Sequence, residues 1–401
     1  MTSTPKIAVL TAALCTALPA SAYQVTDSLE VSGFARAIAG YLDHDSRRFE
    51  GYTDEFSITE QSLVAIQPTY SFSDKFSVTS QLIAHASDER DSGVEWLYLS
   101  YQPDNAWHFR AGKLRMPFFM YSDSVDVGYS YPWVTPPVQV YNNYLFPTFN
   151  GASASYFYSG TDFGLNLETY YGYFRGDLFL AGSRVDVETK VDDLAGLVAT
   201  VSRNNLSLRL SYHQGDNQTV IPYIVPLKDA LYANGLDASA RSLESDGQVY
   251  ALQAAISYDT LNAFYKAEWV KTVTGYDIAP EVIGYYFSAG YVHDDLTFHG
   301  TYSNSEYSEV MPVMELPTEP TGDPQTDALA SAYYQAFATT PNGSLESYSV
   351  GVRWDFRLNM ALKADVTLFQ ESNNDRSGFF NGAAGDDANA TLSQIAWEWI
   401  F

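Results

Sequence analysis

Cysteine, long apolar runs and basic residues are all scarce in this chain of 401 residues. The single cysteine excludes a disulfide framework. No uncharged run of about 18 apolar residues occurs outside the N-terminus, which excludes a protein that crosses a membrane with helices. The 22 Lys and Arg are outnumbered by 48 Asp and Glu, for a net charge of −26. This balance argues against nucleic acid as a partner, because its phosphates would be repelled.

Residues 1–22 have the pattern of a secretory signal peptide. Lys6 supplies the positive charge, an apolar core follows it, and a small-residue Ala-Ser-Ala sequence marks the cleavage site. The one cysteine, Cys15, lies inside this segment and could instead be a lipoprotein cysteine, but Leu14 before it is a poor fit to that processing. We therefore expect export and a mature chain of residues 23–401 that contains no cysteine.

Aromatic residues are abundant, with 31 Tyr and 23 Phe, yet the mean hydropathy of the chain is slightly negative at −0.18. Many aromatic residues are compatible with a negative mean hydropathy because apolar residues alternate with polar ones along the chain. The clearest stretch, residues 348–356, has Tyr, Val, Val, Trp and Phe at every second position and Ser, Gly, Arg and Asp between them. Alternation at period two is typical of a strand with one apolar and one wet face, and it hides a membrane barrel from hydropathy windows.

Tight turns divide the alternating segments into pairs. Their Asn, Asp and Gly residues tolerate the backbone angles that short hairpins need. The turns lie near residues 73–75, 103–105, 159–162, 203–205, 259–260, 294–295 and 357–359. These hairpins, with a first strand at 28–42 and a last strand at the C-terminus, bring the total to about sixteen strands. We predict an all-β fold, a transmembrane antiparallel β-barrel of about sixteen strands.

Longer polar connections alternate with the tight turns. They run near residues 43–56, 86–93, 116–148, 174–192, 214–246, 273–281, 306–345 and 371–390. Membrane barrels have short periplasmic turns and longer extracellular loops, whereas a soluble all-β fold gives no reason for this regularity. The connection at 306–345 has several acids and no base, and its stretch Ala328 to Phe337 could form a short helix. Its acids are either a solvated outer face or are bridged by divalent cations to each other or to lipopolysaccharide.

The last strand ends on a column of aromatic side chains. Ile395, Trp397, Trp399 and Phe401 fall on one face, and Glu398 falls on the other. This ending resembles that of the Gram-negative outer-membrane barrel superfamily, whose assembly machinery reads an alternating last strand with a terminal Phe. The resemblance implies that Trp397, Trp399 and Phe401 form an assembly signal. To close a barrel, this strand must pair with the first one and turn Glu398 toward the lumen.

The connection at 116–148 carries a second resemblance. The residues concerned are Gly112 to Arg115, Pro117, Asp126 to Tyr129, Tyr131 to Trp133, Pro136, Pro137 and Tyr141. They resemble proteobacterial porin-like proteins with a DVGYxYPWxxPP-type third loop, and depart from enterobacterial general porins, which have a Pro-Glu-Phe-Gly-Gly stretch there. With the signal peptide, strand number and terminal Phe, the whole chain resembles Gram-negative outer-membrane porins. The resemblance implies an inward-folded third loop, a homotrimer in outer-membrane lipid and lipopolysaccharide, and a water-filled channel for passive diffusion of small hydrophilic solutes and ions.

Charges of opposite sign divide the predicted lumen. Between Arg115 and Arg175 the chain has no Lys or Arg, so the third loop can bring only negative charge to a constriction, from Asp123 and Asp126. The bases on predicted inward faces of the wall are Arg36, Arg110, Lys113, Arg115, Arg209, Lys266, Arg353 and Lys363. We predict that Asp123 and Asp126 face several of these bases across the lumen and set a transverse field.

The basic wall has two open questions at this point. Glu168, Glu268 and Asp365 also fall on inward faces, so they could pair with the bases in a purely structural way. In the strand before the third loop, strict alternation would turn Lys113 and the arginine after it toward lipid. We expect a bulge at Gly112 to turn both bases inward.

Three other functions remain open. A solute-specific channel would stack sugars on loop aromatics or select anions such as phosphate with wall bases. The loop aromatics are Phe118, Phe119, Tyr129, Tyr131, Trp133 and Tyr144. An outer-membrane barrel enzyme would need a His hydrogen-bonded to a Ser and oriented by an acid or an Asn. The histidines on inward or loop-proximal positions are His85, His108, His213 and His299. A closed surface anchor or adhesin would conduct nothing. No metal-ligand spacing occurs, so neither a metal nor another cofactor is predicted.

Overall fold

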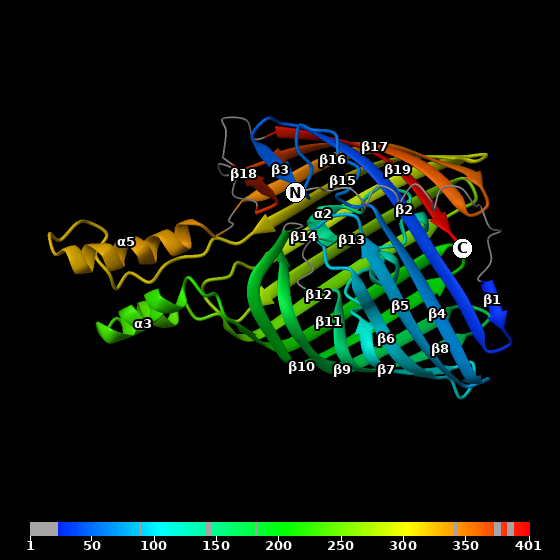
Figure 1. The fold of residues 1–401 in the computed structure, drawn as a ribbon, viewed down its shortest axis with the longest axis horizontal. Coiled ribbons are helices and arrows are strands. Elements are labelled where there is room, and N and C mark those ends of the chain that lie inside the picture. Colours follow the sequence, from blue (N-terminus) through cyan, green and yellow to red (C-terminus); the bar gives the residue numbers. More distant parts are fainter. Residues whose placement is uncertain are drawn as a thin grey trace, which may run out of the picture.

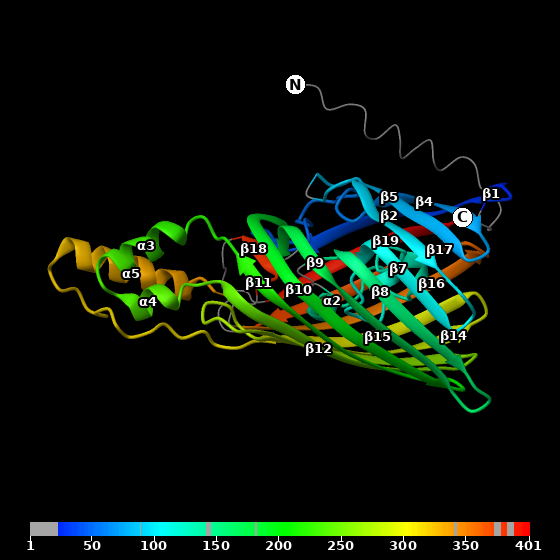
Figure 2. The same cartoon turned by 90° about the horizontal axis from the view of Figure 1, so that it is seen from below.

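A single closed barrel accounts for most of the chain (Figures 1 and 2). The computed structural model describes residues 23–88, 90–141, 146–180, 183–340, 343–372, 378–382 and 389–401, so the predicted signal peptide lies outside them. Within these residues, sixteen antiparallel strands form the barrel. They are β2 (Leu29–Asp43), β4 (Leu63–Ser73), β5 (Phe76–His85), β6 (Gly93–Tyr101), β7 (Trp107–Arg115), β8 (Thr148–Ser159), β9 (Gly164–Leu180), β10 (Ser183–Arg203), β11 (Leu206–Thr219), β12 (Asp246–Asp259), β13 (Ala263–Thr274), β14 (Val282–His293), β15 (Leu296–Tyr307), β16 (Ser344–Arg357), β17 (Met360–Glu371) and β19 (Asn389–Ile400).

Closure joins the two ends of the chain. β19 pairs with β2 from Thr391 opposite Asp43 to Ile400 opposite Phe34, as predicted. Three short strands lie outside the barrel wall. They are β1 (Tyr23–Thr26), which pairs with β2, and β3 (Arg47–Phe49) and β18 (Phe380–Gly382), which pair with each other.

The predicted tight turns are confirmed, because each joins two neighbouring strands at one rim of the barrel. Asn204 and Asp294 have φ angles of 52° in two of these turns. Short polar residues tolerate this left-handed conformation, which tight hairpins require. The long connections gather at the opposite rim, which is extracellular in barrels of this kind.

One predicted connection is wrong. Residues 174–192 are not a loop, because β9 and β10 continue through them and stay paired as far as Leu180 and Ser183. The segment is rich in charge, and Arg175 lies directly opposite Lys190. A strand needs an apolar face only where it meets lipid, so a hairpin that rises above the membrane can carry charge on both faces.

The outer face of the barrel carries the apolar columns that the alternation predicted. Large apolar side chains exposed there include Phe76, Leu82, Leu208, Leu210, Tyr212, Tyr265, Trp269, Tyr348, Val350 and Trp354. A face of this kind must meet lipid, because water would make its exposure costly. None of the helices in the described residues is long and apolar enough to cross a membrane.

The bulge predicted at Gly112 is wrong, and the bulge lies on the neighbouring strand instead. β7 pairs with β8 in continuous register through Gly112. Lys113 pairs with Leu97, which is exposed on the outer face, so Lys113 also lies on that side and donates to the carbonyl of Val94 at 2.8 Å. The register of β5 and β6 shifts at Glu95, and this extra residue turns its carboxylate inward.

Two extracellular connections supply the helices of a unit that projects beyond the barrel, and Ile278 of a third connection packs into its core (Figures 1 and 2). Its helices are α3 (Val225–Ala233), α4 (Asp237–Arg241) and α5 (Pro324–Ala338). They share an apolar core that includes Leu231, Tyr333 and Phe337. The helix predicted from Ala328 to Phe337 is confirmed, and it starts earlier because Asp323 caps it by accepting from the amide of Thr326 at 3.1 Å.

Candidate pore constriction

The third loop, residues 116–147, folds into the barrel interior as predicted (Figure 1). Its described part contains two 3₁₀ turns, η1 (Ser122–Ser124) and η2 (Gly128–Ser130), and the short helix α2 (Val138–Tyr141). The helix packs against β13, β14 and β15, while η2 packs against β19. The loop therefore lies across the lumen against one side of the wall.

Aromatic side chains of the loop pack against this wall. Tyr131 and Trp133 are buried in a cluster that also contains Phe119 and Tyr286 of β14. The indole nitrogen of Trp133 donates to the hydroxyl of Thr301 at 2.8 Å. These aromatics serve packing rather than an open stacking surface. Of the remaining loop aromatics that the sequence singled out, Tyr144 lies outside the described residues.

Basic side chains of the wall bind the loop through its backbone. Irregular backbone buried in a protein needs partners for its carbonyl groups, and the loop has no Lys or Arg of its own. The ammonium group of Lys363 in β17 donates to the carbonyls of Gly128, Tyr131 and Trp133 at 2.6, 2.8 and 2.7 Å. Its side chain is fully buried, so these bonds replace the water that a lysine normally keeps.

Two wall arginines bind the loop backbone in the same way, and together with Lys363 they form a clamp on the loop. Arg353 of β16 donates to the carbonyls of Tyr129 and Tyr131 at 2.7 and 3.1 Å. Arg36 of β2 donates to the carbonyl of Val134 at 2.6 Å and to the hydroxyl of Tyr131 at 3.0 Å. Glu398 of β19 lies 3.3 Å from Arg36 and faces the interior, as the closing strand requires.

Arg209 and Arg115 fasten the start of the loop. Arg209 donates to the carbonyl of Pro117 at 2.6 Å. Arg115 donates to the carbonyl of Ser122 at 2.9 Å, so it faces inward at the end of its strand although Lys113 does not. Most of the predicted basic wall is thus occupied in holding the loop.

Two further bases, Arg110 and Lys266, pair with acids of the wall. Arg110 lies 2.5 Å from Glu168, and Lys266 lies 3.2 Å from Asp259. Lys266 also lies over the ring of Tyr121, 5.7 Å from its centroid. Glu168 therefore pairs with a base of the wall, which is the structural role that the sequence left open for it.

Wall acids bind donors of the loop. Glu268 accepts from the amide of Met120 and from the hydroxyl of Tyr141, each at 2.8 Å. Asp365 accepts from the amide of Val134 at 2.7 Å. These two acids thus hold the loop directly rather than pairing with wall bases as the sequence suggested.

The two loop aspartates lie in different surroundings. Asp123 is exposed and close enough to Glu168 and Arg209 to interact with both electrostatically. Asp126 lies 3.0 Å from Arg115. Burial tends to raise the pKa of Asp126, but Arg115 and more distant bases outweigh it and hold that pKa below its usual range. Asp126 therefore carries its charge firmly.

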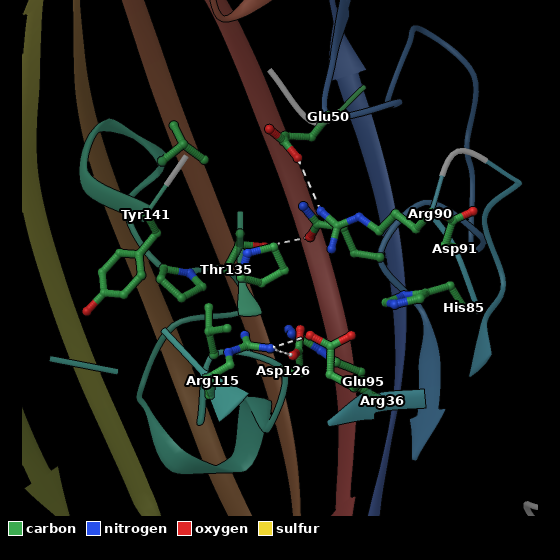
Figure 3. Close-up of a pocket in the computed structure, with 15 residues that line it drawn as sticks. Arg36, Glu50, His85, Arg90, Asp91, Glu95, Arg115, Asp126, Thr135 and Tyr141 are labelled. Carbon is green, nitrogen blue, oxygen red and sulfur yellow. Dashed lines mark hydrogen bonds and ion pairs between the residues drawn. The ribbon is translucent and has the colours of Figure 1, made fainter. Parts of the chain in front are cut away.

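A cavity of about 250 Å³ opens beside Asp126 (Figure 3). Two extracellular connections contribute Glu50 and Arg90 to it, and β5 and β6 contribute His85 and Glu95. Sequence reasoning missed all of these except His85. Glu95 reaches the lumen only through the bulge, and nothing in the sequence shows that Glu50 and Arg90 fold over the barrel mouth.

The histidines bear on the enzyme alternative. His213 contacts the hydroxyls of Ser211 and Tyr170, at 2.8 and 2.6 Å, while His299 lies 3.3 Å from Asp365. Within the described ranges, no histidine ring contacts both a serine and a carboxylate, the arrangement a serine hydrolase uses. No group of three His, Cys, Asp or Glu there is placed to hold a metal ion.

At the C-terminus the predicted aromatic column lies on the outer face. The rings of Trp399 and Phe401 are 4.5 Å apart, and those of Trp397 and Trp399 are 6.0 Å apart. Phe401 exchanges backbone hydrogen bonds of 2.8 and 2.9 Å with Gly33, and its ring occupies the space that a Cβ at Gly33 would need. A glycine is therefore required beside the terminal residue.

Comparisons with known proteins support the architecture. No family model matches the chain, and no curated protein matches its sequence. The anion-selective porin from Comamonas acidovorans is 12% identical, with 93% of this chain and 99% of that chain covered and a TM-score of 0.57. OmpF of Salmonella typhi, in complex with daunomycin, is 13% identical, with 93% and 97% covered and a TM-score of 0.57.

A further solved structure, OmpT expressed in the outer membrane of Vibrio cholerae, is 12% identical, with 95% of this chain and 100% of that chain covered and a TM-score of 0.54. The chain has the fold of a porin-like barrel. Identities this low extend the likeness to the fold alone. The resemblance of the third-loop motif to one group of porin-like proteins therefore stays a prediction.

Proposed function

We propose that this porin-like barrel is an outer-membrane channel for passive diffusion of small hydrophilic solutes and ions. The observation that carries the proposal is the third loop, which is fixed inside the barrel by Lys363, Arg353 and Arg36 and leaves a charged cavity beside Asp126. A plug held this firmly narrows a lumen without moving. In this proposal Asp123 and Asp126 give the constriction its negative charge, and the protein is not an enzyme.

The proposal includes the cellular setting. Residues 1–22 are a signal peptide that is cleaved on export, and residues 23–401 form a channel in the outer membrane of a Gram-negative bacterium. Trp397, Trp399 and Phe401 are the assembly signal. The apolar belt meets lipid, the acidic loops meet lipopolysaccharide, and the working unit is a homotrimer. Trimeric structures among fold neighbours, such as the trimer form of Vibrio cholerae OmpT, support that expectation.

Purified protein reconstituted in planar lipid bilayers tests the channel. We expect stepwise conductance, and a reversal potential in a salt gradient that moves toward anion preference when Asp123→Asn and Asp126→Asn are combined, because negative charge leaves the constriction. Asp229→Asn, on exposed α3, is the matched control. Absence of conductance would refute the channel, and an unchanged potential would remove both aspartates from its selectivity.

A further inference from the structure

The cavity beside the third loop is lined by charges of both signs. Its charged residues in the described ranges are the bases Arg36, Arg90 and Arg115 and the acids Glu50, Asp91, Glu95 and Asp126. Three bases against four acids leave a difference of one negative charge, so the lining has no strong sign of its own. A solute of one sign meets attraction and repulsion there together, whereas a solute with both signs can be attracted at each end.

One end of the cavity has an excess of carboxylate. Asp126 and Glu95 share the guanidinium of Arg115, whose Nη1 lies 3.0 and 2.8 Å from their oxygens. Arg36, which also lines the cavity, is itself paired with Glu398 at 3.3 Å. Both carboxylates keep part of their surface open, at 19% and 18% of the side chain. A primary ammonium group presents three donors and no acceptor, which suits two carboxylates that face one cavity. This end therefore fits an ammonium group.

The other end offers the guanidinium of Arg90. Arg90 lies 3.4 Å from Glu50, a longer contact than those of Arg115, and 31% of its side chain is exposed. Guanidinium has five donors and binds carboxylates in pairs of parallel bonds, so a solute carboxylate can bind Arg90 beside Glu50. Figure 3 shows the Arg90 and Glu50 pair apart from the group of Arg115, Asp126 and Glu95.

Part of the cavity lining is apolar. Val125, Pro136, Val138 and Pro147 contribute to it together with the ring of Tyr141, beside the polar side chains of Gln61 and Thr135. The apolar part can pack against a short side chain. The volume of about 250 Å³ suits a solute of a few heavy atoms beyond its charged groups.

We propose that this cavity binds small zwitterions of the amino-acid or dipeptide kind. The ammonium group lies at Asp126 and Glu95, the carboxylate lies at Arg90, and a short side chain packs on Val125 and Val138. The site rests on the proposed channel function and deepens it, because it names the solutes that the channel retains and passes most readily.

The probes are L-alanyl-L-alanine and two analogues of similar size. N-acetyl-L-alanine lacks the ammonium group, and L-alanine ethylamide lacks the carboxylate. Isothermal titration of the detergent-solubilised full chain should show saturable binding of the dipeptide and at least about tenfold weaker binding of either analogue. Arg90→Gln and Asp126→Asn should each weaken dipeptide binding by about tenfold, while the exposed controls Arg357→Gln and Asp229→Asn leave it unchanged.

Bilayer recordings then separate this site from the channel itself. The dipeptide should block ion current in a concentration-dependent manner, and Arg90→Gln and Asp126→Asn should relieve the block. Conductance without dipeptide binding would overturn the zwitterion site and leave the channel intact. Dipeptide binding without conductance would support the site and overturn the channel. Equal binding of either singly charged analogue would also overturn the site.

Discussion

At Lys363, one ammonium group satisfies three backbone carbonyls of a loop that contains no base. The same wall places Arg36 and Arg353 on neighbouring carbonyls. A base whose donors are all bound to buried backbone has no donor left to bind a solute in the lumen. The basic groups that the sequence assigns to the pore surface therefore mainly fix the loop, and in the proposed channel Asp126 with its neighbours sets the charge that solutes meet.

Removing the Lys363 clamp should loosen the loop and destabilise the fold. Lys363→Met leaves three buried carbonyls without their donor and Glu398 without its nearby ammonium, 3.9 Å away. Changes of this kind cost about 3 to 5 kcal/mol. Urea unfolding in lipid vesicles measures the loss, and single-channel traces should become noisier. Arg357→Met at an exposed turn is the control, and equal stability of the two variants would contradict the clamp.

The charge of Asp126 should persist in acid. Its pKa is held below the usual range despite burial, because Arg115 and more distant bases stabilise the carboxylate. A group with a depressed pKa stays ionised until pH falls through that lower value. The difference in reversal potential between the unmodified protein and Asp126→Asn should therefore persist at pH values that protonate an ordinary Asp. If this difference already disappears in the pH range where an ordinary Asp titrates, the prediction is wrong.

Among the elements, the helical unit is the one that could fold and unfold apart from the barrel. Helices α3, α4 and α5 share a core around Tyr333, which is fully buried and bonds to the hydroxyl of Ser242 at 2.8 Å. The core belongs to extracellular connections, so the strand pairs that close the barrel do not depend on it. A lesion in this core should remain local.

Tyr333→Ala should unfold the helical unit without opening the barrel. Truncation of a buried aromatic side chain lowers the free energy of unfolding by about 3 to 5 kcal/mol. Short helices are only marginally stable by themselves, so they cannot offset this loss. Amide exchange should rise sharply in residues 225–241 and 324–338 and stay slow in the strands. Tyr223→Ala, at a side chain that is 77% exposed, should change neither. Faster exchange throughout the barrel would contradict the independence of the unit.

Strands and turns could be predicted from the sequence because their signals are local. Alternation and the Asp and Asn turns identify hairpins such as the one at Asn204. The error at 174–192 arose because a strand above the membrane loses its apolar face. The site could not be predicted in the same way, because it depends on tertiary contacts that no local pattern encodes. Examples are the bulge that turns Glu95 inward and the backbone carbonyls that accept hydrogen bonds from Lys363.

Taken as a whole molecule, the barrel combines a lipid-facing belt, a closed strand circuit and a fixed internal loop. Closure at Gly33 and Phe401 makes the wall continuous, and the third loop crosses the space inside it. If small solutes pass through this space, they must pass the side of the loop where the cavity lies, and Asp126 borders that cavity. In the proposed channel, Asp126 lies in the conducting path.

Covalent labelling of Asp126→Cys tests whether position 126 lies in that path. The one cysteine of the sequence is Cys15, so in a protein expressed as residues 23–401 the new thiol is the sole target. A water-soluble methanethiosulfonate reagent with a bulky cationic group should lower the current of each conducting unit in a single step. The same reagent on Asp229→Cys, in exposed α3, should leave the current unchanged. Complete labelling of Asp126→Cys with unaltered current would show that position 126 lies outside the conducting path.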